Sequence, residues 1–258
     1  MESKLGAIGV VAAVVLFGCG GATDDGADPA GGNNEHRSGP CPVKPAAGSE
    51  PVAVTVHVRA IVNVQPVAGA HVKLCREIDV TCERGEPPEG LVTDANGDAT
   101  LMVAPGSTEY VQVTGNTDQF LPARYYFNPL TFGARDVNVQ LATPEVRDAL
   151  AGVLGTSQQP GRGIVLLNAL TCQGTAAANV AFSSDVADAA TVRFYVEGAL
   201  PNPALEGTNS TGFGGFLNMQ AGAVTITGTA VESSRVLDSI SVLVQPNAII
   251  QGSLLRGD

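Results

Sequence analysis

The chain is poor in the residue types that most catalytic and nucleic-acid-binding sites need. Its 258 residues include no tryptophan, 3 histidines, and 14 lysines and arginines against 25 acidic residues. The formal net charge of −11 leaves no basic stripe to replace the counterions of a phosphate backbone, which excludes nucleic acid as a partner. Gly-x-Ser-x-Gly, His-Glu-x-x-His and phosphate-loop motifs are also missing. We therefore expect a protein that is not an enzyme and that binds no cofactor.

One metal-binding pattern begins but is not completed. The segment Asp94-Ala95-Asn96-Gly97-Asp98 is similar to the start of a calcium loop. An EF-hand loop would need Gly at Ala99 and a bidentate Glu at Pro105. The 3 histidines are spread along the chain and offer no ligand cluster. The sequence therefore predicts no metal site.

The chain also lacks a hydrophobic run that would span a bilayer comfortably. Its longest N-terminal run, Leu5 to Phe17, is uncharged and follows Lys4. A basic residue before an apolar stretch of about a dozen residues is typical of a secretory signal peptide. We therefore expect residues 1–18 to be a signal peptide and the protein to be exported.

The end of this run carries a more specific pattern. Leu16-Phe17-Gly18-Cys19 resembles the lipobox of bacterial lipoproteins, with Leu three places before Cys and a small residue next to it. The resemblance implies that Cys19 receives diacylglycerol and palmitate-type acyl chains and anchors the protein in the cell envelope. Gly20, where Asp would favour retention, points to the outer membrane, on its periplasmic or surface face. The alternative is an ordinary signal peptide in which Cys19 has no role.

Composition separates a linker from the folded part. Residues 19–51 are rich in Gly, Ala, Asn and Asp and have little to bury, so we expect a lipid-anchored disordered linker there. The rest of the chain has short β-branched runs separated by Gly, Pro, Asn and Asp. That pattern favours an all-β fold over a helical one. The remaining length is enough for two domains.

The first domain is expected at residues 52–142 as a sandwich of about seven short strands. Valines at 52, 54, 56 and 58 alternate with polar or small residues, which predicts a half-buried strand. Asn96-Gly97 lies between two β-type runs and predicts a tight hairpin. The expected strands are 52–64, 71–75, 90–93, 99–103, 109–114, 125–127 and 136–141.

Three motifs in this domain resemble a known family. They are Pro66-Val67-Ala68-Gly69-Ala70-His71-Val72, Thr93-Asp94-Ala95-Asn96-Gly97, and Pro105-Gly106 followed by Tyr110. Together they are similar to the carboxypeptidase regulatory-like (transthyretin-like) domain. The resemblance implies an accessory β-sandwich without catalytic residues of its own.

A short helix and a second sandwich are expected next. In residues 143–162, Thr143 suits a helix cap, Pro144 the first turn and Gly155 the residue past the end. Val146, Leu150 and other apolar residues form one stripe, which indicates packing inside the molecule.

Residues 163–258 carry a diverged copy of the first sandwich. Thr208-Asn209-Ser210-Thr211-Gly212 repeats the predicted hairpin about 115 residues later. Residues 248–255 are expected to form an edge strand, and Arg256-Gly257-Asp258 a frayed terminus. The fold class is thus two tandem Ig/transthyretin-like β-sandwiches joined by a short helix. The expected strands are 163–170, 178–182, 191–196, 224–229, 239–244 and 248–255.

Four cysteines remain besides Cys19, an even count that allows disulfides in an exported protein. Cys75 ends a predicted strand and Cys82 follows after a short loop, so a bridge between them is expected. Their spacing does not match the Cys-x₂-Cys pairs of zinc sites. Cys41 and Cys172 either pair with each other or stay reduced.

Two hypotheses for function follow. The first is a non-enzymatic cell-envelope scaffold or adhesion-type module, with an envelope protein as partner. The second is an accessory module that binds an extracellular carbohydrate or peptide. Tyr125 and Tyr126 are the candidate ligand platform, because adjacent residues of a strand point to opposite faces and one ring should be exposed. The missing tryptophan disfavours the carbohydrate version.

Overall fold

The computed structural model describes residue 41 and residues 50–77, 79–116 and 119–257. The predicted signal peptide, Cys19 and nearly all of the predicted linker lie outside these residues. The described part is almost entirely β-structure with one helix, which confirms the predicted all-β class. That helix is too short to cross a membrane, and no other described segment forms one that could.

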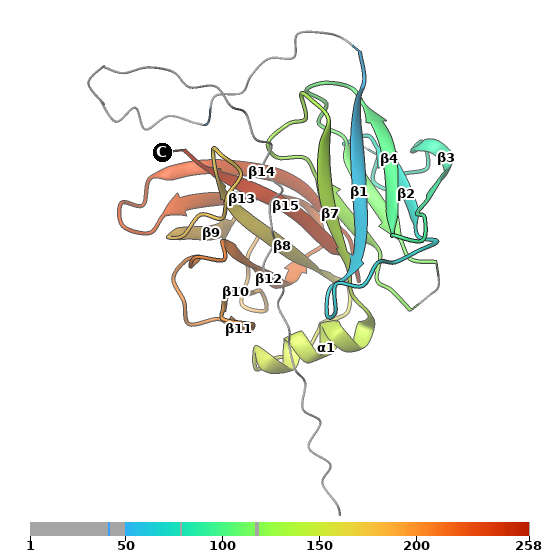
Figure 1. The fold of residues 1–258 in the computed structure, drawn as a ribbon. Coiled ribbons are helices and arrows are strands. Elements are labelled where there is room, and N and C mark those ends of the chain that lie inside the picture. The colour runs from blue at the N-terminus through green and yellow to red at the C-terminus, as the bar shows by residue number, and fades with distance from the viewer. Residues whose placement is uncertain (1–40, 42–49, 78, 117–118, 258) are drawn as a thin grey trace, which may run out of the picture.

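Within the described residues, fifteen strands form one large and two small sheets (Figure 1). The large sheet has nine strands in the order β11-β10-β12-β8-β15-β6-β5-β2-β3. The small sheets have the orders β4-β1-β7 and β14-β13-β9. The strands are β1 Val52–Ala60, β2 His71–Cys75, β3 Glu86–Val92, β4 Asp98–Val103, β5 Tyr110–Thr114, β6 Ala123–Tyr126, β7 Arg135–Leu141, β8 Arg162–Thr171, β9 Val180–Ser184, β10 Val192–Glu197, β11 Leu200–Asn202, β12 Phe213–Gln220, β13 Gly222–Ala230, β14 Val236–Val244 and β15 Ile249–Arg256.

Alternation along the strands explains the layers. In β1, Val54, Val56 and Val58 are fully buried while the residues between them are half-buried, as the sequence pattern predicts. In β15, Ile249 belongs to the core beneath β4-β1-β7, whereas its neighbour Ile250 belongs to the core beneath β14-β13-β9. Each small sheet therefore covers one of the two faces of the nine-stranded sheet.

The predicted edge strand at 248–255 is wrong in its position. Strand β15 lies inside the nine-stranded sheet, parallel to β8 on one side and to β6 on the other. It joins strands of both predicted sandwiches into one sheet. Residues on both faces of β15 are buried, and its sequence shows no apolar–polar alternation, which is why the sequence pattern did not reveal its place.

The strands of the two halves pair in a similar way. Strand β1 pairs antiparallel with β4 and parallel with β7, and β8 pairs in the same way with β12 and β15. The first half also contains the paired series β2-β5-β6, and the second half contains the matching series β9-β13-β14. We call these two sets of strands the first and second repeat.

The two repeated turns are not the predicted hairpins. The first joins β3 in the nine-stranded sheet to β4 in a small sheet, and the second joins β11 to β12 across the intervening β10. In each, a buried threonine hydroxyl closes the turn. The Thr93 hydroxyl donates to the Val67 carbonyl at 2.7 Å and accepts from the Ala70 N–H. Thr208 makes the equivalent bonds to Ala177 and Val180.

A glycine at the same place in each turn adopts a left-handed conformation. Gly97 has φ 72° and Gly212 has φ 65°, whereas Asn96 does not share the positive φ that the predicted hairpin type requires. A Cβ at Gly97 would lie 2.6 Å from the Val58 carbonyl oxygen, and one at Gly212 would lie 2.5 Å from that of Ala169. Each turn therefore needs glycine for its φ angle and for close packing against the first strand of its repeat.

The predicted helix is present as α1 (Pro144–Val153), at the opposite end of the molecule from the C-terminus (Figure 1). The Thr143 side chain caps it and Pro144 opens its first turn, as expected. Its buried side differs slightly from the predicted stripe. Ala151 and Leu154 join the first core, while Val153 is exposed.

Candidate functional site

The tyrosine platform is not on the surface. Tyr125 is 8 % exposed and Tyr126 is 4 % exposed, because β6 lies in the nine-stranded sheet with a core on each face. The two rings do point to opposite faces, as predicted, with Tyr125 in the first core and Tyr126 in the second. The expectation that one ring faces solvent is therefore wrong.

Tyr126 instead belongs to a buried cluster around Arg124. The Tyr110 and Tyr126 rings stack with centroids 5.0 Å apart, and the Arg124 guanidinium lies 4.8 Å from the Tyr110 centroid. Arg124 donates to the Val80 carbonyl and to Gln112. The Tyr110 hydroxyl donates to the Asp79 carbonyl at 2.6 Å. These bonds hold the loop between β2 and β3 over the cluster.

This environment predicts a loss of stability at alkaline pH. Burial raises the pKa of the Tyr110 hydroxyl to about 12, although the Arg124 charge opposes this effect. A pKa above the unfolded value of about 10 means that the contribution of the Tyr110 hydroxyl to folding stability is complete below pH 10 and is lost as the pH rises toward 12.

We expect Tyr110→Phe to be less stable at neutral pH, by about 1 kcal/mol for the lost hydrogen bond. It should also lose less stability than the wild type above pH 10, as urea unfolding across that range will measure. Parallel pH curves for the two proteins would contradict this assignment.

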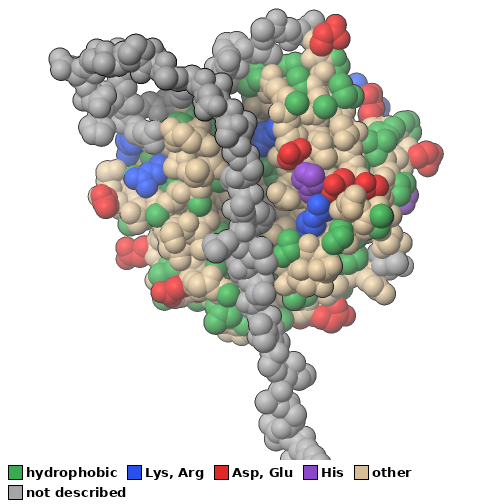
Figure 2. All heavy atoms as spheres, viewed as in Figure 1, with side chains coloured by type: hydrophobic (Ala, Val, Ile, Leu, Met, Phe, Trp, Pro, Cys, Tyr) green, Lys and Arg blue, Asp and Glu red, His purple; other side chains and the backbone are tan. Residues whose placement is uncertain are grey.

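A polar cluster covers the outer face of β4-β1-β7, where Figure 2 shows histidine, acidic and basic side chains together. His57 Nδ1 lies 2.8 Å from the Asp98 carboxylate, and Arg59 donates to the same oxygen at 3.0 Å. Partial burial acts to raise the pKa of Asp98, but the hydrogen bonds from His57 and Arg59 outweigh it and lower that pKa. These contacts join Asp98, the first residue of β4, to His57 and Arg59 on β1. Across the described ranges, no three His, Cys, Asp or Glu residues are grouped so that they could hold a metal.

Both pairs of cysteines form disulfides. Cys75 and Cys82 are bridged as predicted, across the loop that covers Arg124. Cys41 is bridged to Cys172, 131 residues away, which decides the alternative that the sequence left open. Cys172 directly follows β8, and the sulfurs of both cysteines lie about 4 Å from the Arg256 carbonyl. This second disulfide lies beside the C-terminal end of β15.

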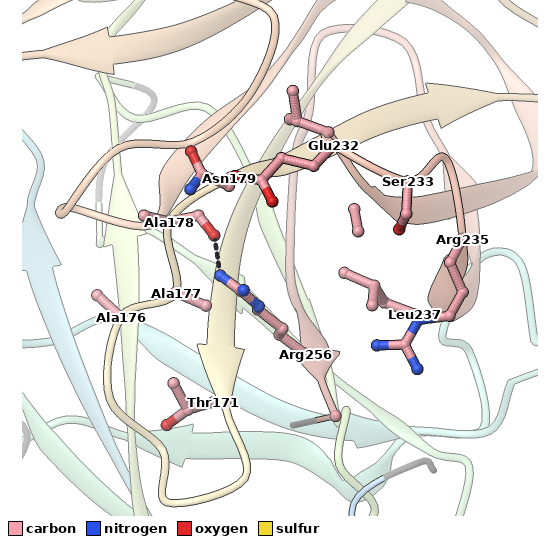
Figure 3. Close-up of a pocket in the computed structure, with 13 residues that line it drawn as sticks. Thr171, Ala176, Ala177, Ala178, Asn179, Glu232, Ser233, Arg235, Leu237 and Arg256 are labelled. Atoms are coloured by element: carbon pink, nitrogen blue, oxygen red, sulfur yellow. Dashed lines mark hydrogen bonds between the residues drawn. The ribbon is translucent and has the colours of Figure 1, made fainter. Parts of the chain in front are cut away.

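A hollow of about 400 Å³ lies at the same end of the molecule (Figure 3). Its walls come from the end of β8, the residues before β9, the β13–β14 connection and the end of β15. Arg256 donates to the Ala178 carbonyl at 2.5 Å, the contact drawn in Figure 3. The residue after Ala178 is Asn179, whose backbone has a left-handed conformation with φ 61°. The hollow is lined by Thr171, Ala176, Ala177, Ala178, Asn179, Ala230, Val231, Glu232, Ser233, Arg235, Leu237, Arg256 and Gly257.

Sequence reasoning missed this hollow because its residues come from four separate segments. Arg256 was expected in a frayed terminus, but it is the last residue of β15 and is half-buried. The available signal was the repeat itself. Aligning the two halves would have placed a charged residue where the first half has an apolar one.

Comparisons with known proteins add little to this description. No protein-family model matches the chain, so the carboxypeptidase regulatory-like resemblance stays a prediction, and no curated protein sequence matches it either. Among solved structures, the Bacillus anthracis TIE protein matches 79 % of this chain and 33 % of its own, with 13 % identity and a TM-score of 0.26. A streptococcal ancillary pilin matches 81 % of this chain and 63 % of its own, with 10 % identity and a TM-score of 0.29. The major pilin subunit BcpA of Bacillus cereus matches 77 % and 68 %, with 12 % identity and a TM-score of 0.26. This chain thus spans a third of the first protein and less than two thirds of the second, and TM-scores this low carry no argument.

Proposed function

We propose that the protein is a non-enzymatic cell-envelope lipoprotein whose folded part is a rigid scaffold or adhesion-type module, held to a membrane through Cys19. The observation that carries this proposal is the disulfide between Cys41 and Cys172. It attaches the chain that follows the predicted anchor to the folded body at the end of β8. An envelope protein is the expected partner.

The disulfide changes where tension from an anchor would act. Without it, the linker would pull on Val52, the first residue of β1, in a small sheet. With it, the pull reaches Cys172, next to the end of β8 in the nine-stranded sheet. The whole first repeat then lies inside a closed covalent loop and bears no tension. Such an arrangement suits a body that must keep its shape while tethered.

Contacts between the two repeats also favour a rigid body. The Gln251 side chain on β15 exchanges two hydrogen bonds with the backbone of Gln140 on β7, at 3.0 and 2.7 Å. Asp238 on β14 accepts from the Asn128 side chain and from the Leu255 N–H, each at 2.8 Å. Together with the shared sheet, these bonds join the repeats at positions far apart along the chain.

The anchor is tested by replacing Cys19. We expect Cys19→Ala to release the exported protein from membranes and to abolish incorporation of a palmitate analogue, since the acyl chains supply the membrane affinity. Cys41→Ser is the matched control, because it also removes one cysteine but should keep the label and stay membrane-bound. Fractionation and mass spectrometry of the mature N-terminus provide the measurement. A Cys19→Ala protein that remains on the membrane would overturn the anchor.

The accessory binding function is the second candidate. The hollow beside Arg256 is the observation that favours it, in place of the buried tyrosines.

A further inference from the structure

The hollow is the place where the two repeats differ most in chemistry. In the paired registers, Val58 of the first repeat corresponds to Ala169 of the second, so Leu141 corresponds to Arg256. Leu141 is fully buried, whereas Arg256 is half-buried and lines the hollow. An apolar side chain that closes the first repeat is thus replaced by a guanidinium in the second.

A second difference leaves the hollow open. In the first repeat, the Asn116 side chain donates to the Ala68 carbonyl at 2.9 Å and covers Gly69. The equivalent carbonyl in the second repeat is that of Ala178, and it accepts from Arg256 instead. The registers of β2 with β5 and of β9 with β13 place Val231 where the first repeat has Asn116. Val231 cannot donate through its side chain, so it cannot replace the hydrogen bond that Asn116 makes in the first repeat.

The charge of the site is unusual for this protein. Two arginines, Arg235 and Arg256, line one hollow in a chain whose net charge is −11. Among the described residues, no carboxylate forms an ion pair with Arg256. Glu232 also lines the hollow, but it forms no ion pair with Arg256 among the described residues. A half-buried guanidinium held by one carbonyl keeps further N–H donors for another acceptor.

The shape and lining fit a small ligand. A volume of about 400 Å³ is within the usual range of about 300–1,000 Å³ for small-molecule sites. Alanines at 176–178, Val231 and Leu237 supply apolar wall, while Thr171, Asn179 and Ser233 supply polar groups. A planar guanidinium matches a carboxylate better than it matches a neutral hydroxyl, because two parallel N–H bonds can form.

From these observations we propose that the hollow is a binding site for a small carboxylate-bearing ligand of the size of a sugar acid or a dipeptide. Arg256 binds the carboxylate, Arg235 adds positive charge, and the alanine wall contacts the ligand body. A sugar acid and a peptide C-terminus share this chemistry. The site does not depend on the membrane anchor, so it stands or falls separately from the role of Cys19.

The test is an NMR titration of the full chain in detergent, following the backbone amides of Ala178, Asn179 and Ser233. The probes are D-glucuronate and N-acetyl-alanyl-alanine, each compared with its neutral counterpart, D-glucose and the dipeptide amide. We expect the carboxylates to shift these amides and their neutral counterparts not to do so. Binding should weaken with added salt, because an accessible charge pair is screened. Which of the two carboxylates binds more tightly identifies the source of the ligand.

Three substitutions and a control separate binding from folding. Arg256→Leu installs the residue of the first repeat, so the fold should be retained while carboxylate binding weakens about tenfold or more, as expected for a lost charged hydrogen bond. Arg235→Gln should weaken binding less, and Glu232→Gln should strengthen it by removing a repelling charge. Arg84→Gln removes one exposed positive charge elsewhere and should leave binding unchanged.

Any of three results would overturn the proposal. The first is equal binding of a carboxylate and its neutral counterpart, and the second is no shift of the three amides by either carboxylate up to its solubility limit. The third is unchanged affinity in a folded Arg256→Leu protein, which would exclude Arg256 as the ligand-binding group.

Discussion

Replacing Cys41 or Cys172 by serine is expected to lengthen the fully unfolded protein by roughly 420 Å when it is pulled between Gly20 and the C-terminus. The disulfide closes a loop of 131 residues, and an extended chain spans about 3.4 Å per residue. The Cys75–Cys82 bridge spans 7 residues and stays closed in this variant, so these residues do not contribute to the added length. Optical-tweezer extension under oxidising conditions measures this length directly.

The chain offers a matched control in its other disulfide. Cys75 and Cys82 both lie inside the loop that Cys41 and Cys172 close. Replacing both residues by serine should therefore leave the unfolded length unchanged, although it also removes one disulfide. Reducing agent added to the wild type should reproduce the long extension. An unchanged length in Cys41→Ser would show that tension does not pass through this bridge.

Thermal stability should respond to the same substitution. In the loop-entropy description, a closed loop of more than 100 residues stabilises the folded state by up to about 5 kcal/mol. We expect Cys41→Ser to unfold at a clearly lower temperature than Cys75→Ser, because the loop closed by Cys75 and Cys82 is far shorter.

Local sequence patterns predicted the elements that have one buried face or a clear end signal. The valines of β1 alternate with polar or small residues, and one face of the strand is buried. Thr143 and Pro144 marked the start of α1. The threonine turns marked the repeat because each depends on a side chain and a glycine at fixed spacing. In each case, the physical cause lies within a few residues of the signal.

What the sequence did not reveal depends on partners far along the chain. Strand β15 is buried on both faces, so its pattern carries no alternation to indicate a central position. Strand β12 (Phe213–Gln220) was not predicted, because its two glycines resemble a loop. A Cβ at Gly215 would lie 2.0 Å from the Val165 carbonyl oxygen, so the glycine there serves close packing against β8. Tyr125 and Tyr126 are buried for the same reason as β15, since both faces of their sheet are covered.

In the candidate site, too, local features were predictable from the sequence, and features that depend on distant segments were not. The Cys75–Cys82 bridge was predictable from a short spacing, whereas the partner of Cys41 required the position of β8. The hollow needs four segments to meet, and only the correspondence between Leu141 and Arg256 makes it stand out. An alignment of the two repeats would therefore have singled out Arg256, but the hollow that it lines needs the three-dimensional arrangement of the four segments.

Gly97→Ala and Gly212→Ala are each expected to lower the free energy of unfolding by about 3 kcal/mol or more. Both positions have positive φ, which costs a non-glycine residue about 1–2 kcal/mol. Both would also place a Cβ within 2.6 Å of a carbonyl oxygen on the first strand of the repeat. Gly155→Ala is the control, because Gly155 has φ 69° but nothing within 4 Å of the added Cβ. Gly155→Ala should lower the free energy of unfolding only by the cost of the positive φ angle, about 1 kcal/mol.

The shape of the unfolding curve then tests whether the two repeats form one body. Gly97 lies in the first repeat and Gly212 in the second, but β15 joins strands of both into one sheet. If the repeats unfold together, each variant should shift a single urea transition, followed by circular dichroism, with an unchanged slope. If they unfold separately, Gly97→Ala should split the curve, with only the part that reports the first repeat moving to lower urea. A split curve would contradict the rigid scaffold, because tension or ligand binding on one repeat would then leave the other unaffected.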